Sequence, residues 1–318
     1  MSVKAAVEKP AKARTPKAPR RRRPVRAQIG MRGTYSEKII SFCFLVPSLI
    51  GVMVFFVAPF AQIIRYALVD NPISNNFVGF QNFISVFKNS AFQMAARNTA
   101  RFSAIAVPLA VVLSLLLAMI LEAKIPGKSK FRTFFLSPMM VPVASIVLIW
   151  QVIFDFNGAL NGVIIALGFT PIDWMKSDYS HIIVVILFLW KNLGYFMILF
   201  MAALSNVPKA LLEAASVDGA SSVRRFFQLK LRFITPTLLF VTILSLINSF
   251  KVFREVYLLT GDYPYEDLYL LQHFMNNTFR SLDYQKLSAA ALIMGVAMAL
   301  IIGILFTAEG RIGRDLEQ

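Results

Sequence analysis

Six apolar segments in this chain are each long enough to cross a lipid bilayer as a helix, which takes about 20 apolar residues for roughly 30 Å of hydrocarbon. They differ from the weakly alternating segments of about ten residues that build an outer-membrane barrel. The segments cover about residues 39–68, 99–121, 133–154, 181–204, 233–254 and 287–307. The sequence therefore predicts an all-α integral membrane protein with six transmembrane helices.

The composition excludes an ordinary soluble protein, because 57% of the 318 residues are hydrophobic and only 16% are charged. The single cysteine, Cys43, lies in the first apolar segment, so the sequence predicts neither a disulfide framework nor a thiolate metal site. His181 and His273 lie at the ends of predicted spans or outside them, and we interpret them as isolated surface residues. We therefore expect no metal centre and no catalytic dyad.

Lys and Arg side chains near the ends of a span tend to stay in the cytoplasm, and their distribution orients the chain. Basic residues gather in the N-terminal tail, in residues 122–132 and 205–232, and in the C-terminal tail. The alternate segments, residues 69–98, 155–180 and 255–286, hold few Lys or Arg and several Asp and Glu. The sequence thus predicts that both termini are cytoplasmic and that the acidic segments face outward.

Residues 1–38 carry about twelve of the 33 Lys and Arg residues and so much of the net charge of +16. The segment is rich in Pro and Ala without apolar periodicity, which predicts a disordered basic cytoplasmic tail. Because the charge lies in one tail, it does not indicate nucleic-acid binding. Arg20 to Arg23 could bind anionic lipid headgroups, but holding the first span's N-terminus inside is the favoured interpretation. A short cytoplasmic tail is expected at residues 309–318.

One cytoplasmic segment between the fourth and fifth spans, LSNVPKALLEAASVDGASSVRRFFQLKLRFITP, carries the signals of folded structure. Pro208 suits the first turn of a helix, and strong helix formers follow as far as Val217. Gly219 suits the left-handed conformation that ends a helix, and Ser221 or Ser222 can cap a second one. The pattern predicts two short helices joined by a sharp corner.

Two interpretations of this element fit its pattern equally well. A rigid helical corner could dock onto another protein and transmit a push, which a flexible loop would absorb. Alternatively, the element could lie on the membrane surface, with four apolar side chains among the headgroups and nothing bound. These side chains are Leu211, Leu212, Phe226 and Phe227.

The segment EAASVDGASSVRRFFQLKLRFITP closely resembles the EAA loop of bacterial ABC-importer permeases. Further matches are VPSLIGVMVFFVAPF, FVGFQNF, RNT at residues 97–99, FRTFFLSPMMVPVASIVLIWQVIF, LSNVP and YLLTGDYP. Together they cover about residues 40–307 and are similar to the carbohydrate-uptake permease family of the maltose and glycerol-phosphate type. The chain departs from the family pattern at Arg232, where proline is usual, and at TGDYP, which replaces a glycine-rich TGGGP type.

The resemblance implies the type I ABC-importer permease fold, with a transmembrane permease domain over residues 39–308 and an EAA coupling loop at about residues 205–236. It also implies a coupling helix seated in a groove of a cytoplasmic ATPase subunit, with Glu213 paired to a basic residue there. The residues of this ATPase-coupling site are Glu213, Ala214, Ala215, Asp218 and Gly219.

The resemblance further implies a multi-pass protein of the bacterial cytoplasmic membrane with several partners. These are a second, homologous permease, two ATPase subunits, an extracytoplasmic sugar-binding protein, the sugar itself and membrane lipids. The chain has no phosphate-binding loop, because GKS at residues 127–129 lacks the glycine five residues earlier and follows no strand. We expect no bound cofactor and no enzymatic activity in this chain; ATP and Mg²⁺ would be used by the partner subunits.

Polar residues within the fourth and fifth spans are the candidates for lining a translocation pathway, because polar groups in hydrocarbon are costly unless they face protein or water. Amide, hydroxyl and aromatic groups are the types that bind sugars. The candidates are Asn192, Tyr195, Asn248, Ser249 and Lys251. For Lys191, Lys251 and Arg254, contact with water or with a partner subunit is the favoured alternative. Because Lys191 and Lys251 could meet an acidic sugar, the charge of the cargo stays open.

We therefore expect a permease subunit that forms half of a sugar pathway and works by alternating access. Pro138 and Pro142 would bend the third span, as a hinge or as a static kink. A secondary transporter driven by an ion gradient is a weaker alternative, because Glu122, Asp155 and Glu255 lie at span ends. A membrane-surface scaffold or lipid-binding protein, the third alternative, is supported by the basic tail alone.

Overall fold

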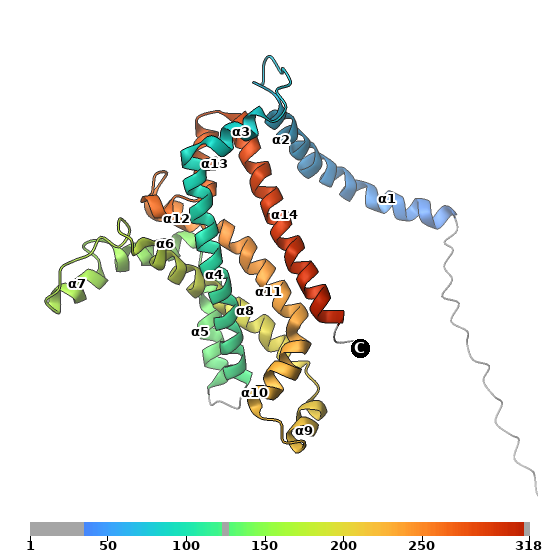
Figure 1. The fold of residues 1–318 in the computed structure, drawn as a ribbon, viewed down its shortest axis with the longest axis vertical. Coiled ribbons are helices and arrows are strands. Elements are labelled where there is room, and N and C mark those ends of the chain that lie inside the picture. Colours follow the sequence, from blue (N-terminus) through green and yellow to red (C-terminus); the bar gives the residue numbers. More distant parts are fainter. Residues whose placement is uncertain (1–34, 123–126, 315–318) are drawn as a thin grey trace, which may run out of the picture. The chain divides into compact units, whose positions relative to one another are not determined.

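Helices make up most of the structure, a computed structural model that describes residues 35–122 and 127–314 (Figure 1). The predicted disordered tail at residues 1–38 lies outside the described residues except for its last four positions, which begin a helix. The last helix continues to Arg314, so part of the predicted C-terminal tail is helical. Two residues in the described part, Val69 and Phe77, form an isolated antiparallel bridge.

The helices before the cytoplasmic element are α1 (Tyr35–Val52), the π-helical turn η1 (Met53–Val57), α2 (Ala58–Leu68), α3 (Gln81–Lys88), α4 (Ser90–Glu122), α5 (Lys128–Met140), α6 (Val143–Phe154), α7 (Ala159–Ala166) and α8 (Ser180–Ser205). Those from the element onward are α9 (Lys209–Val217), α10 (Ser222–Arg225), the π-helical turn η2 (Phe226–Lys230), α11 (Leu231–Lys251), α12 (Phe253–Thr260), the 3₁₀ turn η3 (Glu266–Leu268), α13 (Leu271–Arg280) and α14 (Tyr284–Arg314).

Six helical segments of the described chain are long and apolar enough to cross a membrane, as predicted. They are Ile39–Leu68, Ser90–Glu122, Val143–Ala166, Ser180–Ser205, Ser222–Thr260 and Tyr284–Gly310. The chain divides into two compact units, one up to Val57 and the other from Ala58 onward. In the first unit, large apolar side chains such as Phe44 and Phe55 are exposed, which suits a helix surrounded by lipid.

The core of the second unit is built around α8, which packs against α4, α5 and α11. The Phe102 ring on α4 meets the Phe188 ring on α8 edge to face, with 5.6 Å between centroids. Where α5 crosses α8, a Cβ atom on Gly194 would lie only 1.8 Å from the carbonyl oxygen of Phe135. A glycine is therefore required for the two helices to approach this closely.

The third predicted span, residues 133–154, is not a single helix, and the expected bend falls at Pro142 rather than at Pro138, which lies inside α5. The helix breaks after Met140, where Val141 is extended and Pro142 precedes the first residue of α6. Proline disfavours the helical conformation for the residue before it and lacks the N–H that an intact helix would use. As a result α5 packs along α8, whereas α6 leaves in another direction toward α7 (Figure 1). The span begins at Val143 instead.

The fifth span also differs from its predicted extent of 233–254, because helical structure runs on from Ser222 to Thr260. The chain stays helical through Arg232, the position at which this sequence departs from the family pattern. At the outer end, Gly261 of the TGDYP segment takes a left-handed φ of +79°, and Asp262 pairs with Arg280 of α13. These contacts fix the loop that follows α12.

Candidate functional site

The cytoplasmic element, residues 205–236, begins with α9, which starts directly after an extended Pro208. Gly219 has a φ of +79°, the left-handed conformation that glycine adopts most readily at the end of a helix. The Ser221 hydroxyl then accepts a hydrogen bond from the Arg224 amide at 3.3 Å and caps α10. The predicted corner is confirmed, but its second helix is not short, because α10 continues through η2 into α11.

Both ends of the cytoplasmic element are anchored to the spans. Val207, next to the start of α9, is buried, and Leu212 packs against the main apolar cluster. At the far end, the Lys230 ammonium donates to the Glu122 carboxylate of α4 at 2.7 Å. An element held in this way can move with α4 and α11 rather than bend by itself.

The residues that the resemblance singles out lie on α9 and directly after its last residue, mostly at the surface. Glu213, Ala214, Asp218 and Gly219 are exposed, and Ala215 is half-buried. In the described part of the chain, the Glu213 carboxylate has no hydrogen-bond or ion-pair partner. The four apolar side chains of the element differ in exposure: Leu211 and Phe227 are exposed, whereas Leu212 and Phe226 are half-buried.

A cavity of about 460 Å³, the inner cavity, lies between α5, α8, α11 and α12. Its lining includes Asn192, Tyr195, Asn248 and Lys251, so four of the five predicted pathway residues come together. The Asn248 amide donates to the Asn192 side-chain oxygen at 3.0 Å across the two helices. The Asn192 amide in turn donates to the Phe188 carbonyl at 2.8 Å, which fixes the orientation of the pair.

Ser249, the fifth candidate, lies elsewhere. It is buried between α4 and α11, where its hydroxyl lies 2.8 Å from the Ser103 hydroxyl and donates to the Leu246 carbonyl at 2.7 Å. It therefore joins two helices rather than lining the inner cavity.

Glu255 of α12 is a site residue that sequence reasoning missed. It lines the inner cavity, is only 3% exposed, and forms an ion pair with Lys191 of α8. Lys191 was expected to contact water or a partner subunit; in the structure its ammonium pairs with Glu255 of the same chain, and its side chain stays 32% exposed. A lysine in the middle of an apolar span needs a counter-charge, and that requirement was the signal pointing to Glu255.

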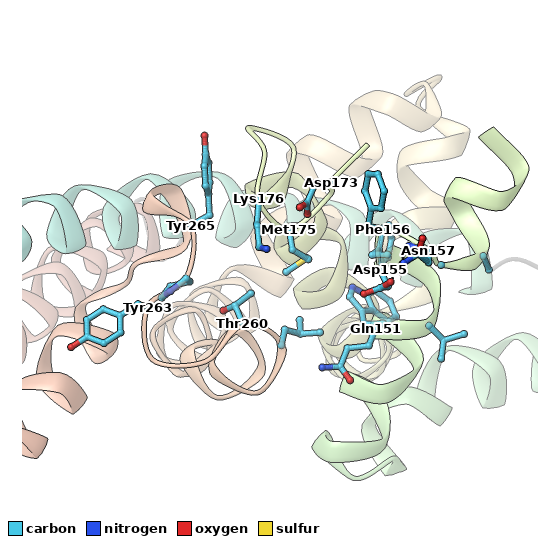
Figure 2. A pocket seen from close by; sticks show the side chains of 17 residues that line it. Gln151, Asp155, Phe156, Asn157, Asp173, Met175, Lys176, Thr260, Tyr263 and Tyr265 are labelled. Carbon is cyan, nitrogen blue, oxygen red and sulfur yellow. Dashed lines mark hydrogen bonds between the residues drawn. The ribbon is translucent and has the colours of Figure 1, made fainter. Parts of the chain in front are cut away.

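A second cavity of about 810 Å³, the outer cavity, lies beside the ends of α6 and α12. Figure 2 shows Asp155 and Gln151 at the end of α6, with Tyr263 and Tyr265 opposite on the loop after α12. The segments that form it are those predicted to face outward. Asp178 accepts a hydrogen bond from the Tyr265 phenol at 3.3 Å and raises the pKa of that phenol above its usual range. Tyr265 is thus a hydrogen-bond donor at neutral pH.

Buried Asn161 of α7 holds the wall of the outer cavity in place. Its amide donates to the carbonyls of Phe156 and Ile172, each at 2.8 Å. Its side-chain oxygen accepts from the Ile172 amide at 3.1 Å and the Trp174 indole at 3.0 Å. Every polar group of this buried side chain is satisfied, so the loop is rigid.

The two histidines are buried, and the prediction of surface histidines is wrong. His181 packs edge to face on Phe102, and His273 lies beside Phe253 and Tyr269. Among the described residues no group of three or more His, Cys, Asp or Glu side chains could hold a metal ion.

Six spans, a rigid cytoplasmic corner and polar cavities define a polytopic membrane transport subunit. Residues 110–318 match the family described as the binding-protein-dependent transport system inner membrane component. The chain belongs to this family, which confirms the predicted permease class and its inner-membrane location. The family is one of transport components rather than enzymes.

Relatives and a solved structure support the same assignment. The sn-glycerol-3-phosphate transport system permease protein UgpA of Salmonella typhimurium is 30% identical over 279 residues, covering 85% of this chain and 93% of that protein. The trehalose/maltose transport system permease protein MalF of Thermococcus litoralis is 29% identical over 286 residues, covering 88% and 97%. A chain of a bacterial ABC transporter involved in the import of the acidic polysaccharide alginate matches with a TM-score of 0.77 at 19% identity, covering 87% and 97%. The fold is therefore that of an ABC-importer permease.

Proposed function

We propose that this chain is one of two homologous permease subunits in an ATP-driven carbohydrate importer. Two ATPase subunits bind on its cytoplasmic side, and an extracytoplasmic binding protein delivers the sugar from outside. The transported compounds in the names of the relatives, sn-glycerol 3-phosphate and trehalose or maltose, support a carbohydrate or polyol cargo. The permease domain of this proposal is residues 39–308.

The observation that carries the proposal is that one helical scaffold connects an exposed cytoplasmic helix to a polar cavity among the spans. The cytoplasmic corner at Gly219 leads through α10 and η2 into α11, which carries Asn248, and after a turn at Val252 into α12, which carries Glu255 at the inner cavity. Movement of α9 would therefore be transmitted along α10 and α11 to the cavity wall.

In this proposal α9 is the coupling helix and enters a groove on the ATPase. Ala214 and Ala215 let the backbone of α9 approach closely, and the Glu213 carboxylate receives a charge-assisted bond from a basic residue of the groove. Asp218 and Gly219 shape the end of the helix. Closure of the ATPase dimer on ATP would pull on α9 and turn the spans outward-open, and hydrolysis would reset them.

The inner cavity is the part of the pathway that contacts the sugar. Asn192, Asn248 and Tyr195 offer amide and phenol groups for hydroxyls, together with an aromatic face for the apolar side of a sugar ring. Lys251 adds a donor at the same wall. Ser249 acts indirectly in this proposal, by fixing α11 against α4 through Ser103.

The test is reconstitution into proteoliposomes with labelled sn-glycerol 3-phosphate, maltose and trehalose as probes. We expect a second permease and an ATPase to copurify with this chain. Uptake should require the whole complex, the binding protein and ATP, and should be blocked by vanadate but not by an uncoupler. Transport by the purified chain alone, or uptake abolished by the uncoupler and not by vanadate, would overturn the proposal in favour of a secondary transporter.

A further inference from the structure

The inner cavity has an excess of positive charge. Lys191, Lys251 and Arg254 line it, and Glu255 is the one acidic residue in the lining. Because Glu255 is buried and already paired with Lys191, it is not free to neutralise another cation. Two positive charges therefore remain in excess.

Lys251 and Arg254 are the unneutralised pair. They are three residues apart in nearly continuous helix, which places them on one face, and both are exposed to the cavity. Neither has an ion-pair partner in the described part of the chain. Both lie within the fifth span, Ser222–Thr260, where a cation without a counter-charge is costly.

The same cavity is also lined by neutral polar groups. Asn192 and Asn248 form a fixed amide pair on α8 and α11, and the Tyr195 ring lies on α8. The cavity therefore offers two sets of groups, one that can bind hydroxyls and one that carries positive charge. A molecule that matches both the neutral polar groups and the cations carries sugar or polyol hydroxyls together with an anionic group.

We propose that the inner cavity selects an anionic carbohydrate, one bearing a carboxylate or a phosphate, with Lys251 and Arg254 as the residues that bind its charge. The inference rests on the proposed function and specifies its substrate class. The Arg254 guanidinium can bind a carboxylate or phosphate through two parallel hydrogen bonds, and the Lys251 ammonium adds a point charge. Apolar walls strengthen both attractions relative to water.

The outer cavity differs from the inner one in charge. Asp155 and Asp173 outnumber Lys176 among its charged lining residues (Figure 2). The two cavities share α12, with Thr260 at the outer one and Arg254 at the inner one. The excess of positive charge is therefore a property of the inner cavity and is not shared by the outer one.

The experiment measures binding to the complete importer in nanodiscs, without the binding protein, so that the specificity of that protein does not decide the result. The probes are two pairs, each with one anionic and one neutral member. The first is sn-glycerol 3-phosphate with glycerol. The second is the methyl glycoside of galacturonic acid, whose carboxylate is free, with methyl galactoside. The variants are Lys251→Gln, Arg254→Gln and the double substitution. Lys176→Gln at the outer cavity is the matched control.

We expect the wild-type complex to bind the anionic member of at least one pair more tightly than its neutral partner. The double variant should weaken anion binding by about tenfold or more, with neutral binding unchanged, and the control should behave as wild type. Equal loss for anionic and neutral probes, a preference for the neutral members, or loss of the second permease from the variant complex would overturn the inference. The last result would mean that a partner carboxylate neutralises these cations.

The outcomes separate this inference from the proposed function. ATP-driven uptake of neutral sugars with no effect of Lys251→Gln or Arg254→Gln would remove the anionic substrate class and leave the importer intact. Absence of ATP-driven uptake of every probe, charged or neutral, would remove the proposed function itself.

Discussion

Lys191 of α8 and Glu255 of α12 form an ion pair at the wall of the inner cavity, and the carboxylate is almost fully buried. The two residues are 64 positions apart in sequence, and their pair joins the fourth and fifth spans. Removing one member of a buried ion pair leaves the other charge unsolvated, which costs more than the pair itself contributes.

Glu255→Gln should therefore destabilise the protein by about 2 kcal/mol, less than for a fully buried pair because the Lys191 side chain is 32% exposed. The thermal unfolding midpoint in detergent measures this. Adding Lys191→Met to Glu255→Gln should recover part of the loss, because the unpaired cation is then gone. If the double variant were as unstable as the sum of both single variants, the two residues would not be coupled.

Gly194→Ala should destabilise the packing of α5 on α8. Its Cβ would lie 1.8 Å from the Phe135 carbonyl oxygen, so the helices must separate, at a cost of about 1–3 kcal/mol. Gly295→Ala on α14 is the matched control, because nothing lies within 4 Å of its Cβ. We expect a lower unfolding midpoint for Gly194→Ala and no loss for Gly295→Ala. Equal midpoints would show that α5 and α8 do not approach so closely.

Gly219 should tolerate asparagine but not proline. Its φ of +79° lies in the left-handed region that asparagine can adopt, whereas proline fixes φ near −65°. Gly219→Asn should keep most of the substrate-stimulated ATPase activity of the reconstituted importer. Gly219→Pro should abolish uptake while the chain still inserts into the membrane. Full activity in the proline variant would mean that the corner does not transmit motion.

The stability of the outer region should fall in mild acid because of His273, which lies outside the spans. Burial lowers the pKa of His273 to about 4, and only Asp262 acts in the opposite direction. In the unfolded chain His273 binds a proton below its ordinary pKa of about 6.5, whereas in the folded chain it stays neutral down to about pH 4. The free energy of unfolding therefore falls as the pH drops from 6.5 toward 4, by up to about 3 kcal/mol. Unfolding midpoints measured between pH 7 and pH 4.5 test this. His273→Gln should flatten the profile, and an unchanged slope would contradict the assignment.

Much of the fold follows from the sequence because span length and charge asymmetry are local properties. The third span was misjudged because apolarity runs unbroken across Val141 and Pro142, while the backbone preference of a residue before proline decides the break. The corner at Gly219 and the Ser221 cap could be predicted because each depends on a few neighbouring residues.

The inner cavity shows what local patterns do not contain. Asn248 and Ser249 are adjacent in sequence, yet one lines the cavity and the other contacts Ser103, since neighbouring residues on a helix point in different directions. The Lys191–Glu255 pair depends on how α8 and α12 pack, which no single segment specifies. The outer cavity depends on the contacts of buried Asn161, which no local sequence pattern indicates.

The central claim is that α9 couples this chain to an ATPase, and the most direct measurement is the binding-protein-stimulated ATPase rate of the reconstituted complex carrying Glu213→Lys. Ser129→Lys, an exposed substitution outside the cytoplasmic element, controls for added positive charge. We expect Glu213→Lys to abolish stimulation and uptake, because the new cation would meet the basic residue that the carboxylate is proposed to bind. Stimulation equal to that of wild type and of Ser129→Lys would contradict the account.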